Sequence, residues 1–303
     1  MRHKALLIIV LSAVILLFAG CGGAPRAQGR TVTDMKGRNV ELSEDVTRVV
    51  ALTAADCEIV YAIGAGDAVV GRGEYCDYPQ EALSVPAVQS GAETNIEQIV
   101  ALTPQVVFLD TMDQSAEQIQ QLEAAGIQVV VSDAVDIEGV YESISVIGQV
   151  MGREDEAREV IDGMKRDFQE LSDKAAAIAD EPTVYFEISP LEYGLWTAGK
   201  GTFMDETASL LHAKNAFADV EGWAGISEEQ VIQRDPEFMV TTEKYAGSGP
   251  TPEQKIRERD GWENLRAVRD GHILNLSDDS LVRPGPRLAD GARQLYEFLY
   301  AGK

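Results

Sequence analysis

Residues 153–179 read REDEAREVIDGMKRDFQELSDKAAAIA, and they carry a long helical pattern. Their apolar side chains recur at steps of three or four residues, from Ala157 through Phe168 to Ile178, which is typical of one face of an amphipathic helix. At a rise of 1.5 Å per residue, roughly 26 residues span about 39 Å, the breadth of a small domain. The pattern therefore predicts a helix that joins two lobes. The alternative is an ordinary core helix of one domain.

Apolar strands alternate with helices on both sides of this segment. The predicted elements before it lie at 49–52, 58–63, 69–70, 96–101, 106–109, 116–125, 128–131 and 137–150, and those after it lie at 184–188, 204–211, 228–233, 238–242, 272–276 and 288–299. Strands separated by helices favour parallel sheets that are covered on both faces. We therefore expect an α/β fold. Two α/β lobes with mostly parallel sheets, residues 31–152 and 181–303, are joined by one long backbone helix at 153–180.

The composition is that of an acidic globular protein. The 303 residues include 26 basic and 50 acidic side chains, which give a formal net charge of −24. This sign argues against a nucleic-acid partner, because phosphates attract the opposite charge. A basic partner surface, a salty habitat or a need for solubility would each explain the acidic excess.

The N-terminus predicts export and lipidation. Basic residues at 2–4 precede an apolar run at 5–18 that is short for a membrane span, and Phe18-Ala19-Gly20-Cys21 follows at once. This arrangement resembles the lipobox of bacterial-type lipoproteins. We expect a signal peptide at 1–20, a lipid on Cys21, a tether at 21–30 and an extracytoplasmic location at the cell membrane, with an uncleaved anchor as the alternative.

Two further cysteines remain in the exported chain. Cys57 and Cys76 form one even pair in an oxidising compartment, which predicts a disulfide between them. Two free thiols are the alternative.

Four loops after predicted strands contain unusual side chains. Ligands of parallel sheets bind outside the carboxyl ends of the strands, so these loops are the candidate site. The loops at 73–79, 190–201 and 221–224 carry large aromatic residues, and the loop at 277–287 carries two arginines and two aspartates. Aromatic surfaces with a few polar groups suit a large, flat, amphiphilic ligand, although any one aromatic could also pack on its own lobe.

Several stretches together resemble a known family of receptors. They are Leu52 to Gly64, Tyr75-Cys76-Asp77-Tyr78-Pro79, residues 95–104 (NIEQIVALTP), residues 222–231 (GWAGISEEQV) and Arg283-Pro284-Gly285-Pro286-Arg287. The whole exported chain is similar to the helical-backbone class of substrate-binding lipoproteins that serve ABC importers of vitamin B12, ferric siderophores and haem. The resemblance implies a monomeric receptor without a cofactor of its own, which captures a corrinoid and docks on a permease and its ATPase. Gly91 stands where a B12-binding relative has tryptophan, so a ferric siderophore or haem remains the alternative ligand.

The resemblance also implies two kinds of site residue. Glu97 and Glu229 match the glutamates that each lobe presents to arginines of the transporter, although ordinary solvated helix carboxylates fit the same positions. The matching cleft residues are Tyr75, Asp77, Trp223, Asp278, Asp279 and Arg283. Tyr193 and Trp196 are added as our own hypothesis, because they lie on a loop of the second lobe and would supply the missing aromatic contact.

Other chemistries find little support. Only His212 and His272 remain after removal of the signal peptide, too few for a histidine metal site, so we expect no metal site. The segment 194–200 spaces Gly and Lys like a phosphate loop, but Gly201 replaces the required Ser or Thr. We expect no catalytic residues, since neither a nucleophile elbow nor a supported acid pair is found. A secreted α/β hydrolase and a surface scaffold remain the alternatives of other classes.

Overall fold

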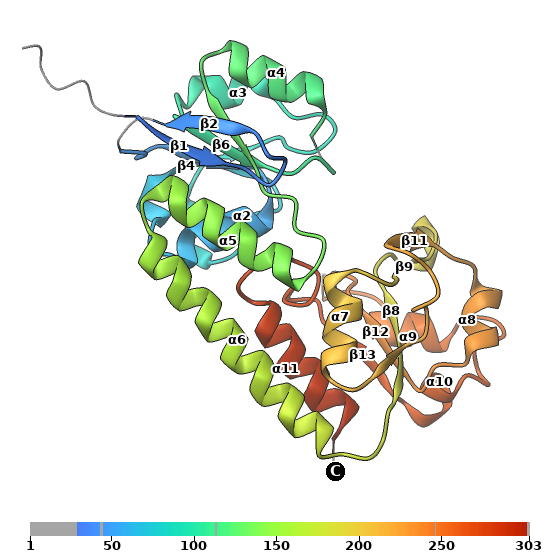
Figure 1. Cartoon of the computed structure of the whole chain (residues 1–303). Helices are drawn as coiled ribbons and strands as arrows, with labels where there is room; N and C mark the ends of the chain where they lie inside the picture. The colour runs from blue at the N-terminus through green and yellow to red at the C-terminus, as the bar shows by residue number, and fades with distance from the viewer. Residues whose placement is uncertain (1–28, 43–44, 113, 246, 302–303) are drawn as a thin grey trace, which may run out of the picture.

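The computed structural model describes residues 29–42, 45–112, 114–245 and 247–301. Two lobes are joined by a long helix (Figure 1). The expected signal peptide and Cys21 lie outside the described residues, as does nearly all of the tether. None of the helices in the described ranges combines the length and hydrophobicity that a membrane span needs.

The first lobe is built on a parallel sheet with the strand order β5-β4-β3-β6-β7. Its strands are β3 (Val49–Ala51), β4 (Val69–Gly73), β5 (Ala87–Val88), β6 (Val106–Leu109) and β7 (Gln128–Val131). Its helices are α2 (Ala54–Ala62), α3 (Ile96–Ala101), α4 (Ala116–Ala124) and α5 (Ile137–Met151). An antiparallel hairpin of β1 (Arg30–Thr33) and β2 (Asn39–Leu42) precedes this sheet and was not predicted.

Both faces of this sheet are buried, as expected of parallel strands. Phe108 and Val130 pack in one apolar cluster with residues of α2 and α5, such as Ile144. Val107 and Val129 belong to a separate cluster on the other face, with residues of α3 and α4 such as Leu122. The continuous apolar runs that predicted these strands reflect this two-sided burial.

The second lobe repeats the theme with the parallel strand order β10-β8-β12-β13. Its elements are β8 (Thr183–Glu187), β10 (Lys214–Asn215), β12 (Phe238–Thr241), β13 (Ile273–Asn275), α7 (Phe203–Leu210), α8 (Glu228–Arg234), α9 (Pro252–Arg257), α10 (Arg266–Asp270) and α11 (Leu288–Leu299). Two stretches predicted as loops pair as a short antiparallel ribbon, β9 (Trp196–Ala198) with β11 (Trp223–Gly225). This ribbon lies at the upper end of the second lobe in Figure 1.

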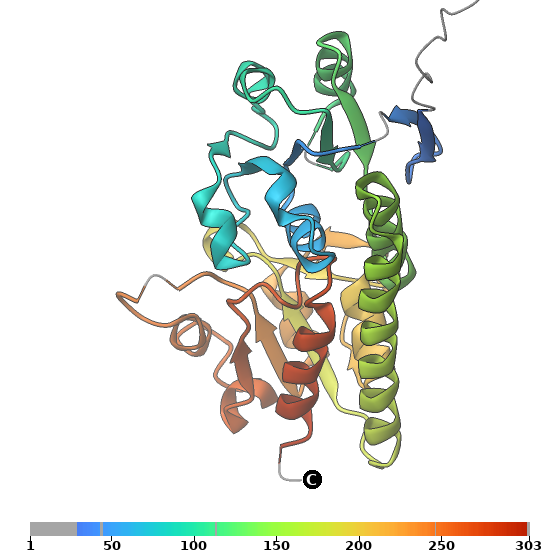
Figure 2. The ribbon, with the colours of Figure 1, turned by 90° about the vertical axis from the view of Figure 1, so that its left-hand side faces the viewer.

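The predicted backbone helix is α6 (Glu154–Ala176). It lies against α5 and α11, and Figure 2 shows α11 running beside it. Met164, Phe168 and Leu171 of α6 belong to one apolar cluster that contains residues of both parallel sheets, so the helix shares a core with each lobe. The helix ends at Ala176, a few residues before the predicted end, and Pro182 follows in the connecting segment.

Helix α2 begins earlier than its apolar pattern indicated. Thr53 caps the helix, since its hydroxyl accepts a hydrogen bond from the backbone N–H of Asp56 at 3.0 Å. The first turn is therefore Ala54 to Asp56 rather than the predicted start at Glu58. As a result, the Asp56 side chain lies at the carboxyl end of β3 instead of in a connecting loop.

Candidate functional site: the pocket between the lobes

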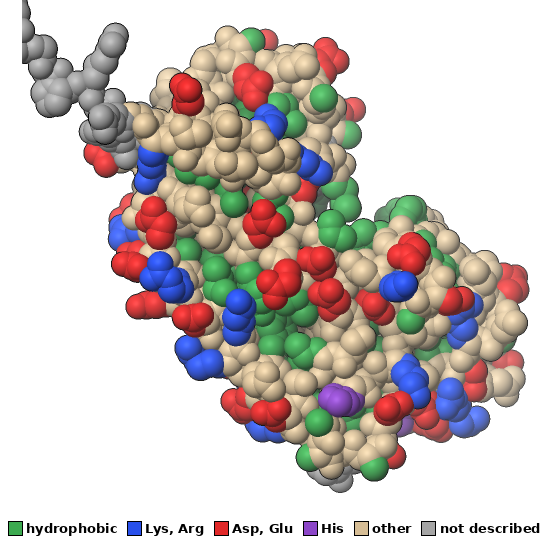
Figure 3. Space-filling model, in the orientation of Figure 1, with side chains coloured by type: hydrophobic (Ala, Val, Ile, Leu, Met, Phe, Trp, Pro, Cys, Tyr) green, Lys and Arg blue, Asp and Glu red, His purple; other side chains and the backbone are tan. Residues whose placement is uncertain are grey.

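A cavity of about 550 Å³ lies at the carboxyl ends of the first lobe's strands. Residues that directly follow β3, β5, β6 and β7 line it, among them Thr53, Ser90, Asp110 and Ser132. The segment Val282–Pro284 from the second lobe closes it on the remaining side. Figure 3 shows a notch between the two lobes above this junction, with acidic and hydrophobic side chains along its borders. The location agrees with the expectation that ligands bind beyond the strand ends.

Asp56 lies at the base of this cavity. Its carboxylate accepts a short hydrogen bond at Oδ1 from the Ser132 hydroxyl, and Oδ2 has no hydrogen-bond partner among the described residues. The residue is 1% exposed. Burial raises the pKa of Asp56 to about 7, since water no longer stabilises its charge, and the hydrogen bonds from the side chains of Ser132 and Thr53 offset this effect only in part.

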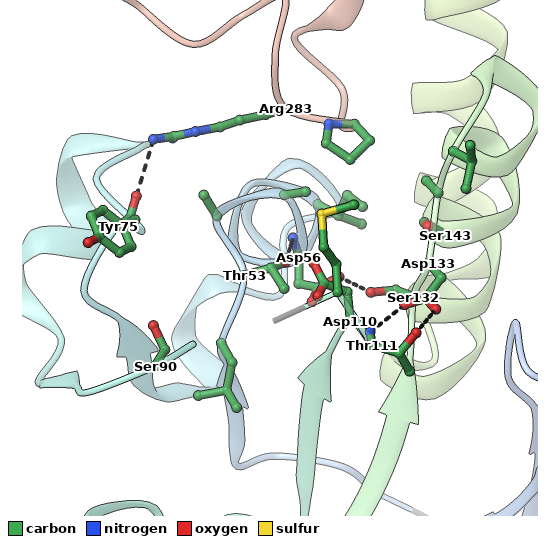
Figure 4. A pocket seen from close by; sticks show the side chains of 18 of the residues that line it. Thr53, Asp56, Tyr75, Ser90, Asp110, Thr111, Ser132, Asp133, Ser143 and Arg283 are labelled. Carbon is green, nitrogen blue, oxygen red and sulfur yellow. Dashed lines mark hydrogen bonds between the residues drawn. The ribbon is translucent and has the colours of Figure 1, made fainter. Parts of the chain in front are cut away.

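Two more carboxylates lie near Asp56 in the same cavity (Figure 4). Asp110 follows β6, and Asp133 follows β7. Asp133 accepts a hydrogen bond from the Thr111 backbone N–H at 2.8 Å and pairs with Lys36 at 2.5 Å. Burial raises the pKa of Asp133, but the bonds from Lys36 and Thr111 outweigh it and leave the pKa below its usual value. The charges of Asp110 and Asp133 in turn raise the pKa of Asp56.

Arg283 joins the two lobes rather than pointing freely into the notch. Its guanidinium lies 2.9 Å from the Glu58 carboxylate and 2.8 Å from that of Asp77, both in the first lobe, and it also pairs with Asp279 of its own loop. It further donates to the backbone carbonyl of Tyr75 at 3.2 Å, a bond drawn in Figure 4. Burial raises the pKa of Asp77, but the Arg283 bond outweighs it and leaves that pKa lowered.

Arg287 strengthens the same junction. It donates to both oxygens of Glu58 at 2.9 Å and 2.7 Å, and its guanidinium lies over the Tyr78 ring at 4.1 Å from the centroid. Glu58, 3% exposed, is thus shared by two arginines from the other lobe. Charge-assisted and bidentate bonds of this kind are the strong ones, so this cluster fixes how the lobes meet.

Both lobes expose aromatic side chains to water. Tyr75 of the first lobe is 77% exposed, and Tyr193 and Trp196 of the second lobe are 80% and 47% exposed. Trp196 lies opposite Gly225 in the β9–β11 ribbon. Tyr75 lines the cavity, so its ring is available for a ligand, and the exposed rings of the second lobe are candidates for the same role.

Two of the predicted cleft residues have internal partners instead. Trp223 is half-buried and packs edge-on against Phe203 with ring centroids 5.3 Å apart. The Asp278 carboxylate accepts bonds from the Ser280 hydroxyl at 2.7 Å and from the Gln294 amide at 3.1 Å. Neither residue lines the cavity described above. Asp279 faces the junction, where it pairs with Arg283 and with Lys244.

The predicted disulfide is not formed in the structure. Cys57 and Cys76 are both buried as free thiols. The Cys76 thiol instead lies 3.1 Å from the Thr53 carbonyl oxygen. The pKa of Cys76 is raised by the hydrogen bond with Cys57 and by burial, so the Cys76 thiol is held in the neutral form.

The two predicted docking glutamates are exposed and lie in separate lobes. Glu97 is in the first turn of α3, which Asn95 caps, and Glu229 is in the first turn of α8, which Ser227 caps. The Ser227 hydroxyl lowers the pKa of Glu229. Both carboxylates are on the surface, one on each lobe, and Figure 1 shows α3 and α8 far apart in the two lobes.

The two carboxylates considered as an acid pair have cationic partners. Arg259 donates to both oxygens of Glu187 at 2.6 Å and 2.8 Å, and Glu192 lies 3.5 Å from Lys255.

The sequence patterns missed three acidic residues of the cavity, Asp56, Asp110 and Asp133. Each follows a predicted strand within a few residues, which was the available signal.

Comparisons with known proteins agree with this geometry. Residues 49–279 match the family described as Periplasmic binding protein. The chain is 34% identical over 308 residues to the uncharacterized ABC transporter substrate-binding lipoprotein YvrC of Bacillus subtilis, covering 96% of this chain and 95% of that one. It is 30% identical over 250 residues to the vitamin B12-binding protein of Salmonella typhimurium, covering 82% and 88%. The solved structure of a possible iron-binding periplasmic solute-binding protein from Staphylococcus epidermidis is similar with a TM-score of 0.73 at 28% identity, covering 85% of this chain and 100% of that one.

Proposed function

Because this chain belongs to the periplasmic binding protein family, we propose that it is the extracytoplasmic solute-binding component of an ABC importer. Its ligand is a bulky metal chelate, a corrinoid in the first instance, held between the lobes without any bond being made or broken. The supporting observation is the cavity of about 550 Å³ at the strand ends of the first lobe, which is lined by the exposed Tyr75 and by the segment Val282–Pro284 of the second lobe. One edge of a macrocycle fits the cavity and its faces contact the exposed aromatic rings.

The contacts follow from the positions of the side chains. Tyr75 packs against the ligand from the first lobe, and Tyr193 and Trp196 pack against it from the second, where aromatic area stabilises a flat ligand. Arg283, with Asp77 and Asp279 around it, forms the inner wall of the site at the junction of the lobes. Because these ion pairs already hold the lobes together, affinity depends more on preformed complementarity than on closure.

Delivery requires docking and an anchor. Glu97 and Glu229 present one carboxylate from each lobe to arginines of the permease, and they set the orientation of the receptor. Exposed ion pairs contribute about 0–1 kcal/mol each, which suits a partner that must also be released. A lipid on Cys21, with residues 21–30 as tether, would hold the receptor at the outer face of the membrane.

A ferric siderophore or haem is the second candidate ligand. The similarity to a possible iron-binding protein of Staphylococcus epidermidis supports it, at 28% identity. The receptor role and the docking mode are the same for both ligand classes.

Calorimetric titration tests the proposal directly. The protein lacking residues 1–21 is titrated with cyanocobalamin, cobinamide, haemin and a ferric trihydroxamate, and we expect saturable binding of a corrinoid. Binding of the iron chelates alone would transfer the assignment to the second candidate. Failure of all four to bind would contradict the receptor role, and a screen with chromogenic esters and phosphates would then test the hydrolase alternative.

A further inference from the structure

We propose that Asp56 and Asp110 form a subsite for an N–H donor group of the ligand, a peripheral carboxamide or an ammonium group, and that this subsite disfavours ligands that present a carboxylate there. The inference rests on the proposed receptor function and adds the chemistry of the group that enters the base of the pocket.

The first argument is the unpaired oxygen. Asp56 is 1% exposed, it lines the cavity, and its Oδ2 has no hydrogen-bond partner among the described residues. A buried carboxylate oxygen without a partner is costly, and native proteins rarely keep one without a reason. A donor that arrives with the ligand would satisfy it.

The second argument is the sign of the charge around the cavity. The cations that line it are already paired: Lys36 with Asp133 at 2.5 Å, and Arg283 with Glu58 and Asp77. The Asp56 carboxylate then adds negative charge at the base of the cavity, and because the residue is 1% exposed, screening by water is weak there. A carboxylate of a ligand would be repelled there, and an ammonium or amide N–H would be attracted.

The third argument is the supply of acceptors and hydroxyls around Asp56. The Thr53, Thr111 and Ser132 side chains line the same cavity, and Figure 4 shows them with Asp56, Asp110 and Asp133 on one side of it. Hydroxyl groups both donate and accept, so they complete the contacts of an amide, which needs an acceptor for its N–H and a donor for its carbonyl.

The subsite predicts a pH dependence of binding. Protonation of Asp56 removes the charge that attracts an ammonium group, so affinity for such a ligand falls as the pH drops below about 7. The other titratable groups that face Asp56 are Asp110, Asp133 and Cys76. Lys36 keeps the Asp133 carboxylate ionised, and the Cys76 thiol is neutral. These two groups therefore do not titrate near pH 7.

Two matched ligand pairs test the subsite by calorimetry at about pH 8. One pair is ferrioxamine B, a ferric trihydroxamate with a free ammonium group, and its N-acetylated derivative. The other pair is cyanocobalamin and a derivative with one peripheral carboxamide hydrolysed to a carboxylate. Within the pair that binds, we expect the ammonium or amide form to bind at least about tenfold more tightly.

Variants then identify the residue responsible. Asp56→Asn keeps the shape and the bond from Ser132, and we expect it to reduce this preference to less than about threefold and to abolish the pH dependence. Asp162→Asn, on the exposed face of α6, removes the same charge far from the cavity and should leave the preference unchanged. Binding without preference, or a preference that survives Asp56→Asn, overturns the subsite but leaves the receptor function intact. Absence of binding in both pairs also overturns the subsite, and the receptor function is then decided by the titrations with cobinamide and haemin.

Discussion

Each lobe buries a carboxylate beside the carboxyl end of a central strand, and the two lobes satisfy it differently. Glu187 ends β8 and receives two bonds from the guanidinium of Arg259, which is itself only 6% exposed. Asp56 lies just beyond β3, receives one bond from Ser132 and has no cationic partner among the described residues. Burial raises the pKa of both groups. The Glu187–Arg259 pair stabilises the second lobe, whereas Asp56 has an oxygen without a partner among the described residues, which is the basis of the subsite proposed above.

The largest expected effect is at the Glu187–Arg259 ion pair of the second lobe. Arg259→Met leaves the Glu187 carboxylate buried without a counter-ion, and we expect the free energy of unfolding to fall by about 3–5 kcal/mol. Urea unfolding at neutral pH measures this. In the double variant Glu187→Met with Arg259→Met no charge is left behind, so most of the stability should return. A loss below about 1 kcal/mol in the single variant would show that the Glu187–Arg259 pair contributes little to the free energy of unfolding.

Removal of the Asp56 charge in the first lobe should instead increase the stability of the protein as the pH rises. The pKa of Asp56 is about 7 in the folded chain and 3.8 without the fold, so its stabilising contribution is complete below about pH 4 and is lost as the pH rises through 7. Asp56→Asn does not titrate. Its stability relative to the wild type should therefore grow by roughly 2–3 kcal/mol between about pH 5 and pH 8. Thermal or urea unfolding at several pH values checks this, and a pH-independent difference would contradict the raised pKa.

The aromatic rim gives a smaller effect, on binding alone. Trp196→Ala removes an exposed ring from the β9–β11 ribbon, and we expect ligand affinity to fall about 5- to 30-fold, or 1–2 kcal/mol. Ile232→Ala removes another exposed apolar side chain, on α8, and serves as the control. Unchanged affinity in Trp196→Ala would remove this tryptophan from the site and leave recognition to the first lobe.

The smallest effect on the purified protein is expected at the docking surface. In Glu97→Ala with Glu229→Ala, ligand affinity should be unchanged and stability should remain within about 0.5 kcal/mol, because both side chains are solvated. Uptake of the chelate by cells should nevertheless be lost. Glu117→Ala, on the exposed face of α4, should preserve uptake. Reduced affinity in the double variant would mean that these carboxylates belong to the pocket.

The scaffold was more predictable than the site. The apolar runs of β6 and β7 and the stripe of α6 are local patterns, and the structure has them within a few residues of the predicted bounds. The ribbon was missed because β9 and β11 have only three residues each, too few for a period to show. The partners of buried carboxylates were missed because they are distant in the chain: Arg259 lies 72 residues from Glu187, and Arg283 lies 225 residues from Glu58. A sequence pattern shows where an acid lies, but not which cation reaches it.

Helix α6 contributes Met164, Phe168 and Leu171 to an apolar cluster that also contains Phe108 of the first sheet and Phe186 of the second. Neither lobe can therefore melt without exposing the apolar face of this helix to water. Heating should produce a single cooperative transition, with equal calorimetric and van't Hoff enthalpies. A chelate bound at one sheet alone would raise the melting temperature of the entire chain.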